Sequence, residues 1–203
     1  MTKWERNPFI SRSPPYPRGL HVDIGIFCLF LNHMAAYLTH SQLRAARSML
    51  RLRQQDLAQK AGIARHVLQL LEDEGRVRPS IDALRRLQRT LEDEGLELLE
   101  ATEAQGEGVR WRFPSGESWV GQLRHARLML GMTLDDLEAI SLVNRYTILR
   151  IENESLTRIP EQAAMTLRKA LATHGVIVLP EDRDTGAGVR LTLVTHEPFS
   201  AAD

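Results

Sequence analysis

Two arginines, Arg65 and Arg145, stand at matching places in two stretches of sequence that lie 80 residues apart. His66 follows the first and Tyr146 follows the second, so each arginine neighbours another side chain that can hydrogen-bond. A guanidinium group can donate two hydrogen bonds to the edge of a guanine base. Exposed arginines are also commonly solvated or paired within their own chain. The sequence leaves both interpretations open.

No comparable grouping of catalytic or metal-binding residues is present. The seven histidines are scattered, and none stands at metal-ligand spacing from another histidine, a cysteine or a carboxylate cluster. The single cysteine, Cys28, excludes an internal disulfide framework. The pairs Gly106–Gly108 and Gly186–Gly188 are typical of hairpin turns rather than of a phosphate-binding loop. We therefore expect a protein that is not an enzyme and that holds no metal and no cofactor.

The matching arginines belong to an internal duplication. A shift of 80 residues aligns Gln42–Phe113 with Gln122–Leu193 without a gap, and 22 of the 72 aligned pairs are identical. A period of this length is too long for a solenoid unit and is the size of a small domain. The predicted division of the chain is a leader at 1–38, a first domain at 39–113, a linker at 114–120, a second domain at 121–194 and a tail at 195–203.

The leader contains four prolines, three of them at 14, 15 and 17, and then an apolar run at 24–31. This run is too short to span a bilayer, which needs about 20 residues. Basic residues ahead of the run imitate a secretory signal, but the prolines and Asp23 do not fit one. Our hypothesis is that Met34 is the native start, with a signal peptide and a partner-binding arm as the alternatives. The lone cysteine indicates a reducing compartment, and we expect the protein in the cytoplasm.

Apolar periodicity predicts the same order of elements in each repeat. Thr39 and Gln42 form a capping-box pattern at the first helix. The first repeat is expected to form helices at 40–51, 54–61, 64–73 and 80–94 and strands at 96–99 and 108–113. The second is expected to form helices at 121–131, 134–140, 144–153 and 160–174 and strands at 176–179 and 188–194. The expected fold class is mainly α, with two tandem four-helix helix-turn-helix domains, each followed by a short β-hairpin.

The second and third helices of each repeat, joined by a tight turn, resemble the DNA-binding domain of the Cro/phage-repressor (Xre) family. The block that carries the likeness in the first repeat is Leu57, Ala58, Ala61, Gly62 and Ile63. A glutamate near the end of the third helix, Glu72 or Glu152, also fits the family. The resemblance covers about 55 residues in each repeat. It implies a compact helical bundle, sequence-specific DNA binding and dimers on two-fold operators.

The family makes its base contacts mainly from the exposed face of the third helix. Helical spacing puts Arg65, His66, Gln69 and Leu70 on the outward face of the third helix of the first repeat, and Arg145, Tyr146, Leu149 and Arg150 on that of the second. The resemblance implies base contacts from Arg65, His66, Leu70, Arg145, Tyr146 and Arg150. Gln69 is a further base-reading candidate because of its place on the same face. The candidate phosphate contacts are Arg53, Gln54, Thr133, Asn144, Arg44 and Arg124. Arg47 and Arg127 are identical in the two copies, and they either neutralise phosphates or pair with Glu72 and Glu152.

The two repeats depart from the family pattern in different places. The first keeps the turn glycine, Gly62, but has Arg53 and Ala64 where helix-capping residues are usual. The second has the caps Thr133 and Asn144 but carries Leu142 in place of the glycine. A leucine in a left-handed turn costs about 1 kcal/mol or more. We therefore expect either strain or a remodelled turn at this position.

The predicted function is a bacterial or phage transcriptional regulator that binds double-stranded DNA through both repeats. The formal net charge is zero, so the contact must come from local basic clusters, and the acidic run at 92–107 should lie away from DNA. The predicted partners are DNA and either a second chain, paired through the hairpins, or the other repeat in a pseudo-dimer. The alternative is a protein-interaction module, such as an antitoxin or anti-repressor, in which one or both DNA-reading faces are lost.

Overall fold

The computed structural model describes residues 38–73, 80–156 and 158–192. The chain divides into two units, residues 1–36 and residues 37–203, and all of the described residues lie in the second. The predictions about the leader and the tail therefore fall outside the described residues, apart from Leu38, which is buried in the core.

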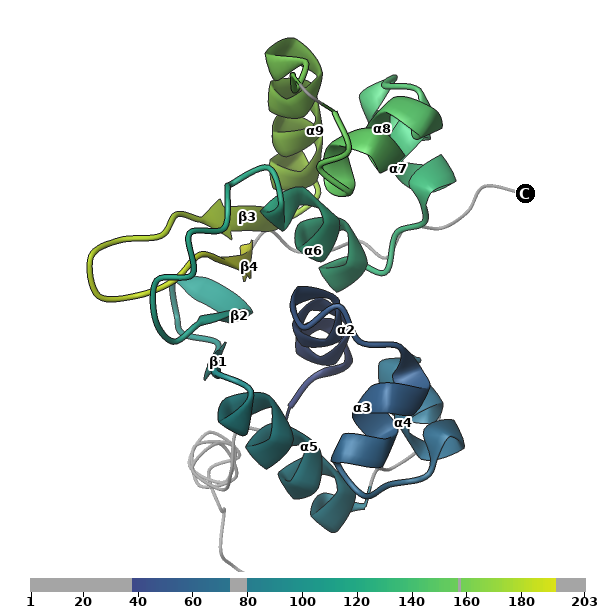
Figure 1. Cartoon of the computed structure of the whole chain (residues 1–203), viewed down its shortest axis with the longest axis vertical. Helices are drawn as coiled ribbons and strands as arrows, with labels where there is room; N and C mark the ends of the chain where they lie inside the picture. The colour runs from purple at the N-terminus through teal and green to yellow at the C-terminus, as the bar shows by residue number, and fades with distance from the viewer. Residues whose placement is uncertain (1–37, 74–79, 157, 193–203) are drawn as a thin grey trace, which may run out of the picture. The chain divides into compact units, whose positions relative to one another are not determined.

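The described residues are mainly helical, with two β-hairpins, as predicted (Figure 1). The first repeat forms α2 (His40–Met49), α3 (Gln54–Lys60), α4 (Arg65–Glu72), α5 (Ile81–Asp93), β1 (Leu96–Leu99) and β2 (Gln105–Trp111). The second forms α6 (Gln122–Met129), α7 (Leu134–Ser141), α8 (Arg145–Glu152), α9 (Glu161–Thr173), β3 (Val176–Leu179) and β4 (Gly188–Thr192). Thr39 makes the predicted capping box with Gln42 at the start of α2.

One hydrophobic core runs through both repeats. Leu57 and Leu68 are fully buried in the first repeat, and Leu137 and Ile148 occupy the matching positions in the second. Leu84, Leu87 and Leu91, which recur at helical spacing in α5, are buried, and so are Ala164, Leu167 and Leu171 of α9. The helical periodicity therefore identified the inward faces correctly, because burial of these faces is what holds short helices in place.

The two hairpins join in a single antiparallel sheet with the strand order β1-β2-β4-β3. In the central pair, Val109 lies opposite Val189, and Gly108 and Arg110 lie opposite Arg190 and Gly188. Residues 188, 189 and 190 are the second-repeat copies of residues 108, 109 and 110, and they pair with them in reverse order. This register is the one that a two-fold axis through the Val109–Val189 pair would produce. Helix α2 also packs against its counterpart, α6. The repeats are the two halves of one body, joined through equivalent surfaces.

The interpretation of the paired glycines as turn residues was wrong for three of the four, whereas Gly186 does lie in the loop between β3 and β4. Gly106 and Gly108 lie within β2, and Gly188 begins β4. A Cβ atom on Gly108 would lie 2.8 Å from the carbonyl oxygen of Val189, and one on Gly188 would collide with Arg110. Glycine is needed here because two backbones approach too closely to leave room for a side chain.

We expect Gly188→Ala to lower the free energy of unfolding by about 1–3 kcal/mol, because the added methyl group forces the central strands apart. Chemical denaturation of the full chain measures this. Glu107→Ala changes a residue of β2 that has no such contact and is the matched control. Equal stability of Gly188→Ala and the parent protein would contradict the close approach.

Candidate nucleic-acid interface

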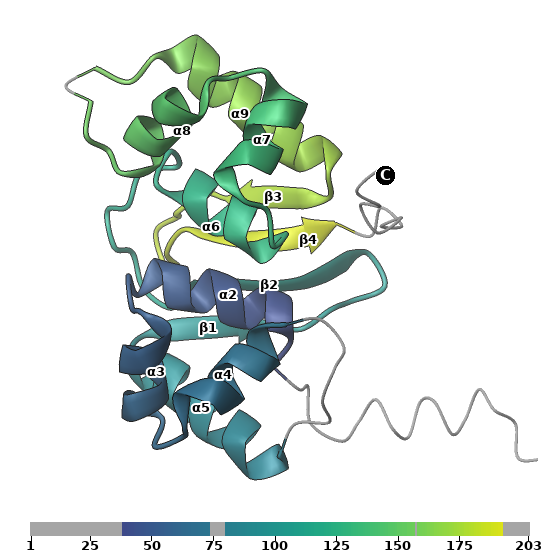
Figure 2. The same cartoon turned by 90° about the vertical axis from the view of Figure 1, so that its right-hand side faces the viewer.

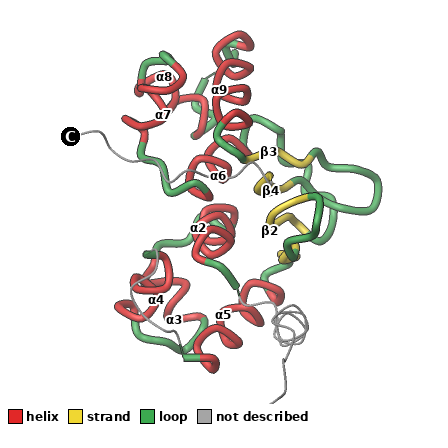
Figure 3. The backbone as a smooth tube through the Cα atoms, turned by 180° about the vertical axis from the view of Figure 1, so that it is seen from behind, coloured by secondary structure: helices red, strands yellow, loops and turns green. Residues whose placement is uncertain are grey.

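Two helix pairs, α3–α4 and α7–α8, lie on the side of residues 37–203 that faces away from the sheet. Figures 1 and 3 show the strands on one side of this unit and both pairs on the other. In Figure 2 the two pairs face the viewer, with α2 and α6 between them. Helices α4 and α8 are therefore presented together on one face, which we call the helical face.

The turn within each pair has the same backbone conformation. Gly62 has a φ of 62° and Leu142 a φ of 58°, both in the left-handed region. The sequence predicted either backbone strain or a remodelled turn at Leu142. The turn keeps the conformation found at Gly62, so Leu142 is strained. The leucine is 90% exposed, so its side chain gains no burial that would offset the strain. Asn144 then caps α8 by accepting a hydrogen bond from the Tyr146 N–H at 3.0 Å.

Each helix pair is held to the core by a buried arginine–glutamate ion pair. The Arg47 Nη2 atom donates to Glu72 Oε2 at 2.9 Å, and the Arg127 Nη2 atom donates to Glu152 Oε2 at 2.7 Å. Both glutamates are buried. Of the two roles expected for these arginines, the structure has the internal pairing, which fixes the end of α4 or α8 to the first helix of its repeat.

The exposed face of α4 carries side chains with unused hydrogen-bonding capacity. Arg65, His66 and Gln69 are exposed, and none of their side chains bonds to another described residue. Leu70, the fourth predicted base-reading residue of this helix, is partly exposed and apolar. The structure thus brings together all four predicted residues on one surface of α4.

The exposed face of α8 is organised differently. The Arg145 Nη1 atom pairs with the Asp135 carboxylate at 2.7 Å, and its guanidinium lies over the Tyr146 ring, 5.9 Å from the centroid. Arg150 is exposed and forms no side-chain bond to another described residue. Two of the three predicted base-reading residues of α8 are therefore tied to each other, and Arg150 is the freely available cation.

The predicted phosphate contacts are largely engaged within the chain. Arg53 pairs with Asp56 at 2.8 Å, and Gln54 donates to Glu72 at 2.8 Å. The hydrogen bond from Arg53 lowers the pKa of Asp56, which also accepts the backbone N–H of Arg53, whereas no side chain at position 53 caps the first-turn N–H groups of α3.

The remaining predicted phosphate contacts divide between the helix starts and the α2–α6 junction. The Thr133 hydroxyl bonds to Asp136 at the start of α7, and Asn144 caps α8. Arg44 donates to the Leu128 carbonyl at 3.1 Å, across the junction between the repeats. Arg124 bonds to Asn153 at 3.4 Å. Arg44 thus contributes to joining the two repeats.

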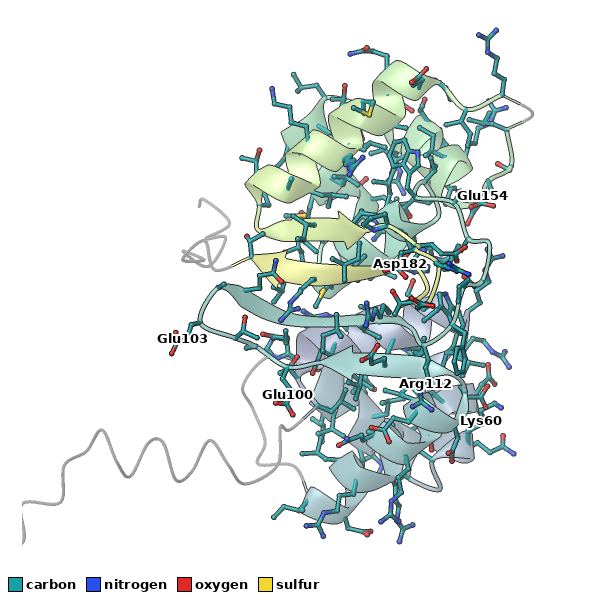
Figure 4. The ribbon with its side chains drawn as sticks, turned by 90° about the vertical axis from the view of Figure 1, so that its left-hand side faces the viewer. Lys60, Glu100, Glu103, Arg112, Glu154 and Asp182 are labelled. Carbon is teal, nitrogen blue, oxygen red and sulfur yellow. The ribbon has the colours of Figure 1, made fainter. Side chains whose placement is uncertain are left out.

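Exposed glutamates of the acidic run lie on the sheet side, together with basic residues such as Arg112. Figure 4 views this side and shows Glu100 and Glu103 beside the turn that joins β1 to β2. Both residues are exposed and belong to the acidic run at 92–107. This run is therefore separated from the helical face, where α4 and α8 lie.

A buried polar cluster at the α2–α6 junction was missed by the sequence reasoning. The His125 Nδ1 atom lies 2.7 Å from Ser48 Oγ, and its Nε2 atom lies 3.2 Å from Glu117 Oε1. Trp111 donates its indole N–H to Glu117 at 2.8 Å. Ser48 is only 4% exposed, so its hydroxyl is shielded from solvent and joins the two helices. The sequence signal that could have indicated this cluster is His125, which stands where the first repeat has Ala45, although the rest of the first helix is similar in the two repeats.

Opposing effects act on the pKa of Glu117. Burial alone would raise it, but the hydrogen bond and charge of His125, together with the Trp111 hydrogen bond, lower it to about 2. The carboxylate is therefore ionised at neutral pH and holds the cluster together.

The described part of the chain holds no group of three or more histidine, cysteine, aspartate or glutamate side chains placed to bind a metal ion. None of its helices combines the length and the apolar character needed to cross a membrane. A scan of protein-family models, a search of curated proteins and a search of solved structures each return no match to this chain. Function is therefore inferred from the residues and their geometry.

The strained turn gives one prediction. We expect Leu142→Asn to raise the free energy of unfolding by about 1 kcal/mol, because asparagine tolerates the left-handed conformation and no packing is lost. Gly62→Leu, at the equivalent turn, should lower it by a similar amount. Urea denaturation of the two variants measures both effects, and a shift of the same sign in both would contradict the assigned strain.

The buried cluster gives another prediction. Glu117 has a lower pKa in the folded protein than in the unfolded chain, so it stabilises the fold above about pH 4.5, and this stability is lost as the pH falls toward 2. We expect Glu117→Gln to lower the free energy of unfolding by roughly 1–2 kcal/mol at pH 7, after allowance for solvent screening. The difference should shrink between pH 4.5 and pH 2.

Denaturation curves of both proteins across this pH range are the measurement. Glu103→Gln, an exposed glutamate on the sheet side, is the control and should show no such trend. A Glu117→Gln effect of constant size at all pH values would contradict the ionised cluster.

Proposed function

We propose that this chain is a transcriptional regulator that binds specific double-stranded DNA sequences through two helix-turn-helix units, α3–α4 and α7–α8. The observation that carries the proposal is the placement of α4 and α8 on one face, with the arginines Arg65 and Arg150 exposed on it. The family resemblance of the sequence supports the same function, and we propose that the protein acts in the cytoplasm of a bacterium, encoded by the bacterium or by a phage.

In this proposal α4 and α8 each enter a major groove of the same duplex. Arg65 and Arg150 are free to make bidentate contacts with guanine, and His66 and Gln69 can bond to other base edges. The buried Arg–Glu pairs hold the recognition helices in place without using the exposed arginines. The sheet side, which carries the acidic run, would then face away from the duplex, which suits a chain with no net charge.

The two-fold register of β2 and β4 supports binding as a pseudo-dimer within one chain. In a dimer of identical chains, a two-fold axis presents the same helix twice, to the two halves of a palindrome. Here the axis relates unlike helices, so the proposed target has two unlike half-sites. A homodimer built through the sheet would have to use β1 and β3, because β2 and β4 already pair with each other.

A second function is favoured by the surface of α7. Asp135, Asp136 and Glu138 lie on this helix, whereas the matching positions of α3 hold a single acidic residue, Asp56. Negative charge beside α8 opposes binding to phosphates. A protein-interaction module, such as an antitoxin or anti-repressor, is the function that would use such a surface.

DNA selection distinguishes the two functions. The full chain is incubated with a random pool of duplexes, bound duplexes are sequenced, and their affinities are measured at 50 and 200 mM salt. We expect an enriched two-part motif and weaker binding at the higher salt, because phosphate contacts release counterions. The absence of both an enriched motif and salt dependence would contradict DNA binding.

Substitutions then assign the contacts. We expect Arg65→Ala and the double change Arg145→Ala/Arg150→Ala each to weaken binding by about 10- to 100-fold, corresponding to about 1–3 kcal/mol for a bidentate base contact. Arg112→Ala removes an exposed arginine on the sheet side and is the matched control (Figure 4). Loss through only one variant would assign DNA reading to that repeat, and equal loss in the control would indicate a non-specific charge effect.

A further inference from the structure

At three matching positions of the two helix pairs, the exposed surface is more apolar in the second repeat, whereas Leu70 and Ala64 of the first repeat correspond to the polar Arg150 and Asn144 at their own matching positions. Where the first repeat has Gly62, His66 and Gln69, the second has Leu142, Tyr146 and Leu149. The exposed fractions of these three second-repeat residues are 90%, 69% and 40%. Polar or absent side chains are thus replaced by apolar or aromatic ones that stay in contact with solvent.

Packing within the chain does not account for these apolar side chains. None of the three lies in the core, and Leu142 also holds a strained backbone conformation. Strained residues persist where the surrounding structure enforces them and are concentrated at functional sites. We call the surface formed by Leu142, Tyr146 and Leu149 the apolar face of α8. Its side chains are available to contact a bound partner rather than the core of the chain.

The polar capacity of α8 is reduced at the same time. Asp135 holds the Arg145 guanidinium over one side of the Tyr146 ring, which leaves the rest of the ring available. Arg150 is the free cation of this helix, whereas α4 has hydrogen-bonding groups at Arg65, His66 and Gln69. The two recognition helices therefore offer different chemistry to a base pair.

We infer that α8 reads the C5-methyl group of pyrimidines, whereas α4 reads base edges by hydrogen bonding. This inference rests on the proposed DNA-binding function. The thymine methyl is the apolar group that a normal base pair presents in the major groove, and apolar side chains recognise it by contact. A 5-methylcytosine presents the same group. The specificity-determining residues are Tyr146 and Leu149, with Leu142 at the margin of the face.

The test removes methyl groups without changing base pairing. A duplex selected by the full chain is resynthesised with uracil in place of thymine, first in the half-site bound by α8 and then in the half-site bound by α4. Each methyl group lost from the α8 half-site should weaken binding by about three- to fivefold, as expected for exposing one buried methyl group. The α4 half-site should change by less, because Leu70 is its one exposed apolar side chain on this face.

A further set of duplexes distinguishes the two sources of the methyl group. Each cytosine of the α8 half-site is replaced by 5-methylcytosine. Tighter binding would extend the reading to methylated cytosine, and unchanged binding would assign it to thymine alone.

Exchanging side chains between the repeats is the matched control. The double change Tyr146→His/Leu149→Gln installs the first-repeat residues on α8 and should abolish the uracil effect there. The converse, His66→Tyr/Gln69→Leu, should create a uracil effect in the α4 half-site. All four positions are exposed, and thermal unfolding of each variant checks that the fold is kept.

The outcomes separate the inference from the function on which it rests. If the full chain selects no duplex, the proposed DNA binding fails and this inference fails with it. If it selects a duplex whose affinity is unchanged by uracil in the α8 half-site, DNA binding stands and methyl reading is overturned. In that case the apolar face of α8 would be assigned to contact with a protein.

Discussion

The close pairing of β2 with β4 is the contact on which the arrangement of the two repeats depends. Gly108 and Gly188 let the backbones meet around the Val109–Val189 pair, where a side chain would not fit. That register also brings α2 against α6, with Arg44 and the His125 cluster completing the junction. Because α4 and α8 are anchored to α2 and α6 by Arg–Glu ion pairs, their relative positions follow from this one junction.

The local elements were predictable from the sequence because each is determined by its own pattern. Leucines at helical spacing in α5, the capping box at Thr39 and the duplicated order of elements gave bounds within one to three residues of those observed. For Leu142 the alignment with Gly62 left a strained turn and a remodelled turn open, and the structure has the strained one. For the elements themselves, neighbours in the chain carried enough information.

The joining of the repeats could not be predicted in the same way. Glycines 106, 108 and 188 look like turn residues when only their neighbours are considered, and their real constraint is a strand that lies about 80 residues away. His125 likewise differs from Ala45 for a reason that is visible only once α2 and α6 meet. Helices and strands produce periodic patterns of apolar residues that can be recognised in a sequence. Long-range contacts of this kind produce only isolated residue differences, which have no such pattern.

The same limit applies to the candidate site. The exposed positions of α4 and α8 were identified from periodicity, but the sequence did not indicate that Asp135 restrains Arg145 or that Gln54 and Arg44 are engaged within the chain. These pairings depend on side-chain geometry between elements. The arginines that are identical in both repeats have two different roles. Some, such as Arg127, are buried and pair with a glutamate, whereas others, such as Arg65, are exposed and are candidates for contact with DNA.

The β2–β4 junction also has a consequence for how such a protein would respond to its own abundance. A regulator assembled from separate chains must first dimerise, so its occupancy of DNA rises steeply with concentration and collapses at low copy number. Here the second recognition helix is supplied by the same polypeptide, at a fixed and high effective concentration. Under the proposed DNA-binding function, occupancy by the single chain would follow a simple binding curve rather than a cooperative one, because no assembly step precedes binding.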